Sequence, residues 1–221
     1  MYENQTTVAR TRDSVLATNK VLRNTYLLLS MTLLFSGLTA YVSMQVGIHL
    51  GIIPTLLIYF GLLFATEKTA DSGLGLLFVF LLTGFLGFTL GPMLNAYLAL
   101  PNGGELVMTA LGGTGVIFLG LSGYALTTRK DFSFIGGMLV TGILVAFVAG
   151  LAAYAFGLQG LSLGVSAMFV LLMSGLILFQ TSQIVHGGET NYIRATVTLY
   201  VSIYNLFTSL LHLLGAFGGD D

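Results

Sequence analysis

Long apolar runs separated by short polar segments make up almost the whole chain. Seven of them approach or exceed the length that an α-helix needs to cross about 30 Å of hydrocarbon. They cover residues 22–46, 50–66, 74–99, 106–126, 133–157, 161–185 and 192–217. The pattern predicts an all-α integral membrane protein, with one seven-helix transmembrane domain over residues 21–217 and a short external tail at 218–221.

The first 20 residues do not share this pattern, because they are polar and show no apolar periodicity. They predict a flexible cytoplasmic N-terminal tail over residues 1–20. The run that follows is longer than the apolar region of a secretory signal. We therefore interpret it as the first membrane span and not as a cleavable signal peptide.

The basic residues predict the orientation of the bundle. With seven spans, every Lys and Arg falls in the N-terminal tail or in one of the even-numbered loops. The eight residues are Arg10, Arg12, Lys20, Arg23, Lys68, Arg129, Lys130 and Arg194. Because basic residues gather on the cytoplasmic side of membrane proteins, we predict a cytoplasmic N-terminus and a periplasmic C-terminus.

The composition supports a membrane protein and excludes several kinds of chemistry. Of the 221 residues, 55% are hydrophobic and only 8% are charged, whereas a soluble domain carries roughly 25% charged residues. The net charge of −1 gives no sign of a nucleic-acid partner. The chain has no cysteine, which rules out disulfides, thiolate nucleophiles and cysteine-ligated metals.

Glycine and the ionisable residues indicate what the membrane-embedded part does. The 29 glycines predict close helix packing, for example at Gly87 and Gly91 and in the glycine-rich fourth span, with a pore or hinge as the alternative. No acidic or basic residue lies in the middle of a span. A charge-coupled pump is therefore disfavoured, because such proteins rely on buried ionisable groups.

Neutral polar residues remain inside the spans. Asn95 follows Pro92, whose ring removes a helical hydrogen bond. Gln180, Ser202 and Asn205 lie on the last two spans at comparable depth. These side chains either hold helices together or line a polar path through the bundle, and the sequence leaves both interpretations open.

Two predicted cytoplasmic loops carry candidate helix caps. Asp131, in the loop with Arg129 and Lys130, precedes the fifth span, and the stretch Glu189-Thr190-Asn191 lies just before the seventh. A carboxylate at a helix start can accept hydrogen bonds from free backbone N–H groups. Capping is the simpler interpretation of these loop residues, and binding of a partner or an ion is the alternative.

One short string resembles a catalytic motif. Residues 120–123 read GLSG, similar to the serine motif of rhomboid intramembrane proteases, which pairs its serine with a histidine. Here Ser122 is expected near the cytoplasmic end of its span and His212 near the outer end of the last span. His186 is closer in depth but lies in a loop. Because a nucleophile and its base must lie within hydrogen-bond reach, we expect no protease, no other enzyme activity and no cofactor.

Four stretches of the chain form a recognisable pattern. Residues 125–137 read ALTTRKDFSFIGG, and residues 91–95 read GPMLN. Residues 20–26 read KVLRNTY, and residues 186–196 read HGGETNYIRAT. The first two resemble signatures of the Bax inhibitor-1 (TMBIM) family, and the last two resemble its enterobacterial branch, the modulators of the FtsH protease. The resemblance extends over residues 18–217.

This resemblance implies a bundle whose last helix is enclosed by the other six. It also implies two candidate activities. One is binding to the membrane-anchored, ATP-driven FtsH protease in the bacterial inner membrane and restraint of its action on membrane proteins. The other is a pH-sensitive calcium leak, which several family members support through an aspartate pair on the last two spans. The matching positions here are Gln180 and Ser202, which do not titrate near neutral pH, so calcium conduction is expected to be weak or absent.

The leading hypothesis is therefore a non-enzymatic regulator that binds FtsH. The polar tail offers the protease a segment to grip, while the glycine-rich bundle resists extraction, so the chain acts as a slowly processed competitor. The alternative is an ion leak near Gln180, Ser202 and Asn205.

Overall fold

The computed structural model describes the backbone of residues 3–218 and the side chains from residue 18 onward. Within that range the chain forms seven α-helices and no strand. The helices are α1 (Glu3–Val46), α2 (Ile52–Thr69), α3 (Leu74–Leu98), α4 (Gly103–Thr128), α5 (Gly136–Phe156), α6 (Gln159–Val185) and α7 (Tyr192–Phe217). A single 3₁₀ turn, η1 (Ser133–Ile135), leads into α5.

Every predicted span has a counterpart in the structure. Each of the seven helices contains a segment long and apolar enough to cross a membrane. Apart from the start of α1, the differences at helix ends are small: α2 ends at Thr69 rather than at residue 66, and α4 begins at Gly103 rather than at residue 106. Polar residues can form these extra turns because a helix end no longer needs to be apolar where it leaves the hydrocarbon. The prediction of an all-α, seven-helix membrane protein is confirmed.

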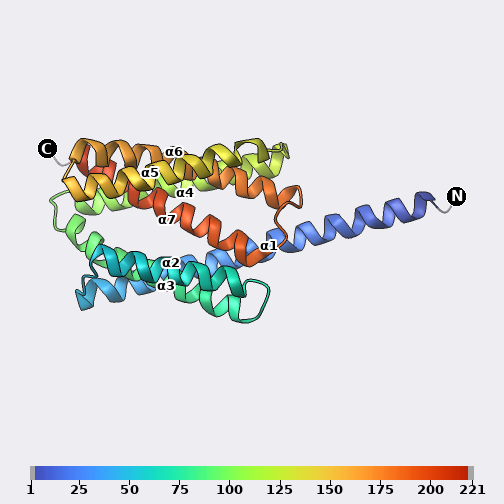
Figure 1. The fold of residues 1–221 in the computed structure, drawn as a ribbon, viewed down its shortest axis with the longest axis horizontal. Coiled ribbons are helices and arrows are strands. Elements are labelled where there is room, and N and C mark those ends of the chain that lie inside the picture. Colours follow the sequence, from blue (N-terminus) through green and yellow to red (C-terminus); the bar gives the residue numbers. More distant parts are fainter. Residues whose placement is uncertain (1–2, 219–221) are drawn as a thin grey trace.

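The first helix begins well before the membrane span. Its apolar segment starts at Thr18, but the helical backbone starts at Glu3. Figure 1 shows this N-terminal part of α1 reaching beyond the rest of the bundle. The polar segment therefore continues the helix of the first span, whereas its flexibility and its cytoplasmic location stay predictions.

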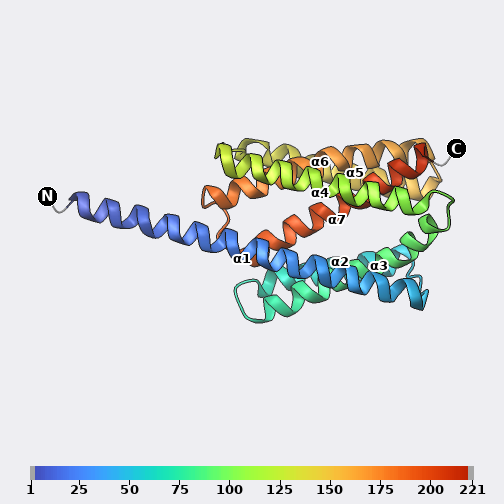
Figure 2. The same ribbon diagram turned by 180° about the vertical axis from the view of Figure 1, so that it is seen from behind.

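The helices form two groups of three with α7 between them. In the first group α3 packs against both α1 and α2, and in the second group α6 packs against both α4 and α5. Figures 1 and 2 show the two groups on opposite sides of α7, which crosses obliquely between them. The last helix contacts α1, α3, α4 and α6. It thus occupies the central position that the resemblance implied, while α2 and α5 lie further out.

The main apolar core lies where α7 meets α1, α3 and α6. Fully buried side chains from these helices include Leu82, Ile177, Leu199 and Leu206, each 0% exposed. By contrast, α2 buries only Thr66, and α5 buries only Leu139, Ala146 and Ala153, as expected for helices that face lipid. Polar side chains on α7 are buried along with the apolar ones, and so are polar side chains on α1 and α6.

Close approach between α1 and α3 depends on two of the predicted packing glycines. A Cβ atom at Gly87 would overlap the Ser36 carbonyl oxygen, and one at Gly91 would overlap the Ser43 side chain. The packing interpretation is therefore right for α3. It is wrong for most of the α4 glycines, since Gly112, Gly115, Gly120 and Gly123 have no other atom within 4 Å of an added Cβ.

Candidate functional site

One end of the bundle carries three loops that hydrogen-bond to one another, and we call it the basic end. These loops comprise residues 70–73, 129–132 and 186–191, and they correspond to the predicted cytoplasmic side. The Arg194 guanidinium at the start of α7 contacts Glu67 at 2.8 Å and Asp71 at 3.1 Å. All three side chains are at least one-third exposed. Exposed ion pairs contribute little stability, so these pairs mainly hold the first loop in position.

Asn191 joins the same loop to the helix start. Its Oδ1 accepts hydrogen bonds from the backbone N–H groups of Ile193 and Arg194, which caps α7. Its Nδ2 donates to the Ala70 carbonyl oxygen at 3.0 Å and to Asp71 Oδ1 at 2.8 Å. One side chain therefore both begins the central helix and attaches it to the loop between α2 and α3.

A second set of hydrogen bonds ties α6 to the loop between α4 and α5. Ser182 Oγ donates to the Lys130 carbonyl oxygen at 3.1 Å and accepts from the Phe132 N–H at 3.0 Å. His186 Nε2 lies 3.0 Å from the Arg129 carbonyl oxygen. Arg129 adopts a left-handed backbone conformation, with φ of 50°, which turns the chain out of α4.

The two predicted capping carboxylates both accept backbone hydrogen bonds. Asp131 Oδ1 accepts from the Ser133 N–H at 2.8 Å, at the start of η1. Hydrogen bonds from Ser133 hold the pKa of Asp131 below its ordinary value. Glu189 Oε1 accepts from the Asn191 N–H at 2.7 Å, so it supports the capping residue of α7, and Asn191 makes the cap itself.

Of the three predicted polar residues on the last two spans, two hydrogen-bond within their own helix and one does not. Ser202 Oγ donates to the Thr198 carbonyl oxygen and Asn205 Nδ2 to the Val201 carbonyl oxygen, both within α7. Gln180 is 5% exposed, and its Nε2 is buried without a hydrogen-bond partner among the described residues. No hydrogen bond joins any two of these three side chains in the described part of the chain, so a polar path through them stays a prediction.

Asn95 lies away from the other three, towards the opposite end of the bundle. Its Nδ2 donates to the Met44 carbonyl oxygen at 2.9 Å and so links α3 to the end of α1. Since the side chain is exposed, it acts as a connection between helices at the surface.

A buried network of hydrogen bonds between hydroxyl groups was not predicted from the sequence. The Tyr200 hydroxyl hydrogen-bonds Ser36 Oγ and donates to the Thr83 carbonyl oxygen at 3.0 Å, joining α7 to α1 and α3. The Tyr204 hydroxyl lies 2.8 Å from Thr89 Oγ1. Tyrosines at span ends suggest interfacial anchors, but these two lie in the middle of the last span and four residues apart. The four-residue spacing, which places both side chains on one face of the helix, was the feature of the sequence that could have indicated the network.

The serine and histidine of the protease-like motif have different partners. Ser122 Oγ lies 3.4 Å from Thr181 Oγ1. His212 Nδ1 lies 2.7 Å from Ser166 Oγ. Each group therefore contributes to contacts with α6, and the structure does not pair Ser122 with His212.

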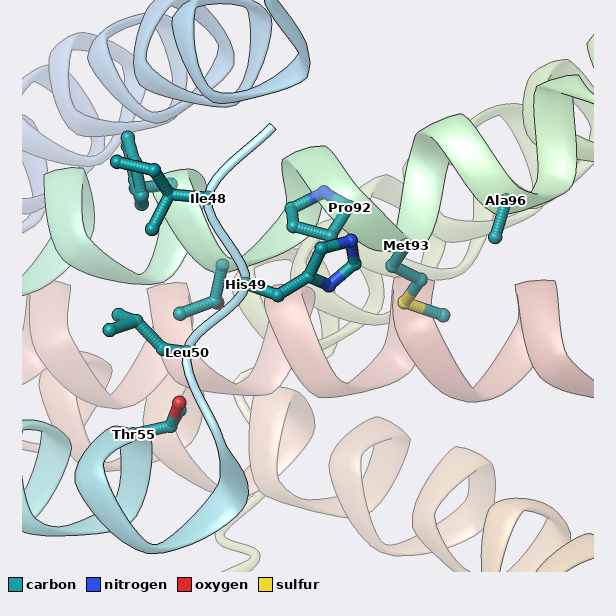
Figure 3. A pocket seen from close by; sticks show the side chains of 9 residues that line it. Ile48, His49, Leu50, Thr55, Pro92, Met93 and Ala96 are labelled. Carbon is teal, nitrogen blue, oxygen red and sulfur yellow. The ribbon is translucent and has the colours of Figure 1, made fainter. Parts of the chain in front are cut away.

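A pocket of about 410 Å³ opens at the end of the bundle opposite to the basic end. It lies between the loop at residues 48–50, the start of α2 and the Pro92 region of α3 (Figure 3). Figure 3 shows the His49 ring beside Pro92, with Met93 and Ala96 further along α3. The nine lining residues include no carboxylate, so they offer none of the charged oxygen ligands that Ca²⁺ prefers.

We predict that Ser182→Ala loosens the loop between α4 and α5. The substitution leaves the Phe132 N–H and the Lys130 carbonyl oxygen without their partner, at a cost of about 1–3 kcal/mol. Faster amide exchange at residues 130–133 measures the effect. Ser174→Ala is the matched control, because among the described residues Ser174 bonds only to the Val170 carbonyl oxygen of its own helix. Equal exchange in both variants would contradict the prediction.

Comparison with known proteins identifies the relatives of this chain. A family model described as "Inhibitor of apoptosis-promoting Bax1" matches residues 18–219. The "Modulator of FtsH protease YccA" of Escherichia coli K12 is 54% identical over 205 residues, which cover 92% of this chain and 93% of that protein.

Two other relatives match over nearly their whole length. An uncharacterised protein of Pseudomonas aeruginosa is 51% identical over 221 residues, covering 100% of this chain and 98% of its own. A membrane protein of Vibrio cholerae is 46% identical over 211 residues, covering 95% of each chain. With a family match over nine-tenths of its length, this seven-helix membrane protein belongs to the Bax inhibitor-1 family.

Proposed function

We propose that this chain is an inner-membrane modulator of the FtsH protease. The observation that carries the proposal is its 54% identity to the Escherichia coli protein named as such a modulator, over more than nine-tenths of both chains. A second Escherichia coli relative with the same identity is named an inner membrane protein. The match covers 92% of this chain and 93% of each relative, and the proposed role is regulatory rather than enzymatic.

The geometry of the bundle supports a mechanism in which the chain restrains FtsH because FtsH degrades the chain itself slowly. An ATP-driven protease grips an extended or protruding segment, and the N-terminal part of α1 reaches beyond the bundle. Extraction of α1 must then separate it from α3 and α7, where its side chains are fully buried at Thr25 and Thr32. A substrate that the protease engages readily but unfolds slowly occupies the protease and delays the degradation of other substrates.

Competition for FtsH tests this proposal directly. Raising the amount of this chain in cells is expected to lengthen the half-life of another membrane protein that FtsH degrades, and tagged chain is expected to co-purify with the protease. A seven-helix membrane protein of another family, expressed at the same level, is the control. An unchanged substrate half-life together with no co-purification would overturn the proposal.

Deletion of residues 2–15 tests the part assigned to the N-terminal segment. We expect the shortened chain to persist longer in cells, because the protease loses the segment that it grips, while its co-purification with FtsH remains. The half-life after a block of protein synthesis measures the effect.

Replacing the deleted segment by an unrelated polar sequence of equal length is the control, and it is expected to restore the original half-life. In cells depleted of FtsH the shortened and full-length chains are expected to be equally long-lived. An unchanged half-life of the shortened chain in normal cells would contradict the mechanism, although not the binding itself.

The calcium leak remains the alternative activity. It rests on membership of the family, and the positions that correspond to the aspartate pair hold Gln180 and Ser202. Neither side chain can carry the shared proton that two buried carboxylates would bind. The modulator proposal is therefore the better supported of the two.

A further inference from the structure

The two three-helix groups leave an apolar crevice where α1 and α4 face each other. The crevice has a volume of about 280 Å³. Its walls come from one face of α1, including Gly37 and Ala40, and from Val107 and Leu111 of α4. Figure 2 shows α7 visible between α1 and α4 in this region. The central helix therefore forms the floor of a crevice that opens sideways between the groups.

Apart from the exposed Tyr41, the polar side chains that line the crevice are already hydrogen-bonded. Tyr200 and Ser36 bond to each other, and Tyr200 also donates to the Thr83 carbonyl oxygen. Tyr204 bonds to Thr89. Thr114 donates to the Ala110 carbonyl oxygen at 2.7 Å. With these groups paired, the remaining lining is hydrocarbon, and an occupant gains nothing from a polar group of its own.

The crevice opens sideways between membrane-spanning segments, where the surrounding medium is hydrocarbon. A flexible hydrocarbon chain does fit, because it needs only a narrow groove.

We propose that this crevice binds an acyl chain of a membrane phospholipid. It lies entirely along membrane-spanning segments, where hydrocarbon chains are the surrounding medium. Its lining runs along α1 from Leu33 to Met44, towards the end opposite to the basic end. Under the predicted orientation, the lipid belongs to the outer leaflet. Tyr41, which is 63% exposed and lines the crevice near that end, is placed to meet the glycerol or headgroup region.

An acyl chain in this position contacts the central helix directly. Tyr200, Ile203, Tyr204 and Phe207 of α7 all line the crevice. Two of them belong to the buried hydroxyl network that joins α7 to α1 and α3. The bound chain thus fills space at the junction of both groups and stabilises their arrangement around α7.

Filling the crevice with a side chain tests the proposal. Gly37 lines the crevice, and a Cβ at this position meets no atom within 4 Å, so Gly37→Leu can fold while it takes the space of the lipid. The purified protein is incubated with 1-palmitoyl-2-oleoyl-phosphatidylethanolamine in detergent, and retained lipid is measured by native mass spectrometry. We expect the original chain to retain one lipid and Gly37→Leu to bind it about tenfold more weakly.

Gly61→Leu is the matched control, because Gly61 on α2 is equally open and does not line the crevice. It is expected to retain lipid as the original chain does. Phosphatidylglycerol with the same chains is expected to bind equally, since the crevice recognises hydrocarbon. Equal retention by Gly37→Leu and Gly61→Leu would overturn the proposal. The proposal would also be overturned if Gly37→Leu retained lipid unchanged but no longer co-purified with FtsH. That result would mean that the crevice binds a protein partner.

Discussion

Gly87→Leu is expected to destabilise the bundle more than any other single substitution considered for this protein. A Cβ at this position would overlap the Ser36 carbonyl oxygen and the Thr39 hydroxyl. Backbone on α1 cannot move aside as the end of a flexible side chain can, so α1 and α3 must separate. Overpacking of a well-packed core costs typically 1–3 kcal/mol, and occasionally more. We expect the upper end of that range or beyond, because the obstacle is backbone.

Thermal aggregation in detergent, followed by size-exclusion chromatography of the soluble fraction, measures this loss. Gly61→Leu on α2 provides the control, since its added side chain meets no neighbour and leucine has the better helix propensity. A melting temperature for Gly87→Leu equal to that of Gly61→Leu would show that α1 and α3 are not packed as described.

The double substitution Gln180→Asp with Ser202→Asp is expected to create a pH-dependent calcium influx that the original chain lacks. Gln180 is 5% exposed and Ser202 is 0% exposed, so both new carboxyl groups would be buried. Two carboxyl groups in a low-dielectric interior share one proton, because both cannot ionise at little cost. Loss of that proton as pH rises leaves two like charges, which push α6 and α7 apart. Proteoliposomes loaded with a calcium dye, at about pH 6, 7 and 8, measure the influx.

Asn205→Asp is the control for an added carboxyl group alone. Asn205 lies on α7 near Ser202 but is half-buried and bonded to its own helix, so a single carboxyl there can make no pair. We expect its influx to stay at the background level, like that of the original chain. A pH-dependent influx through the original chain would instead favour the leak as its activity, and the modulator proposal would then lose its priority.

The spans illustrate how much of the fold follows from local sequence. Each span was predicted within a few residues, because the need to satisfy every backbone hydrogen bond in hydrocarbon makes a long apolar run a helix whatever its neighbours are. The predicted capping of α7 was less complete. The sequence predicts capping by residues 189–191 without choosing among them, and Asn191 makes the cap, since several types of side chain can cap and only the backbone path shows which one reaches the free N–H groups.

The candidate site depended on contacts between distant residues. Nothing in the order of the chain places Ser182 beside Lys130, or Arg194 beside Glu67, because these pairs lie 52 and 127 residues apart. Likewise, the glycines of α3 and α4 look alike in sequence, but those of α3 all lie against another helix, whereas most of those of α4 do not. In lipid, apolar residues face outward as readily as inward, so hydrophobicity cannot tell which face of a helix is packed.

The sequence by itself therefore determined the class of protein, the number and approximate limits of its membrane spans and its family. Those features follow from composition, from local backbone chemistry and from motifs that can be read along the chain. Only the tertiary structure decided that α7 lies between two groups of three helices, that the three loops of the basic end are hydrogen-bonded together and that a crevice remains between α1 and α4. These features arise from the relative rotation and spacing of packed helices, which a one-dimensional pattern of apolar residues does not specify.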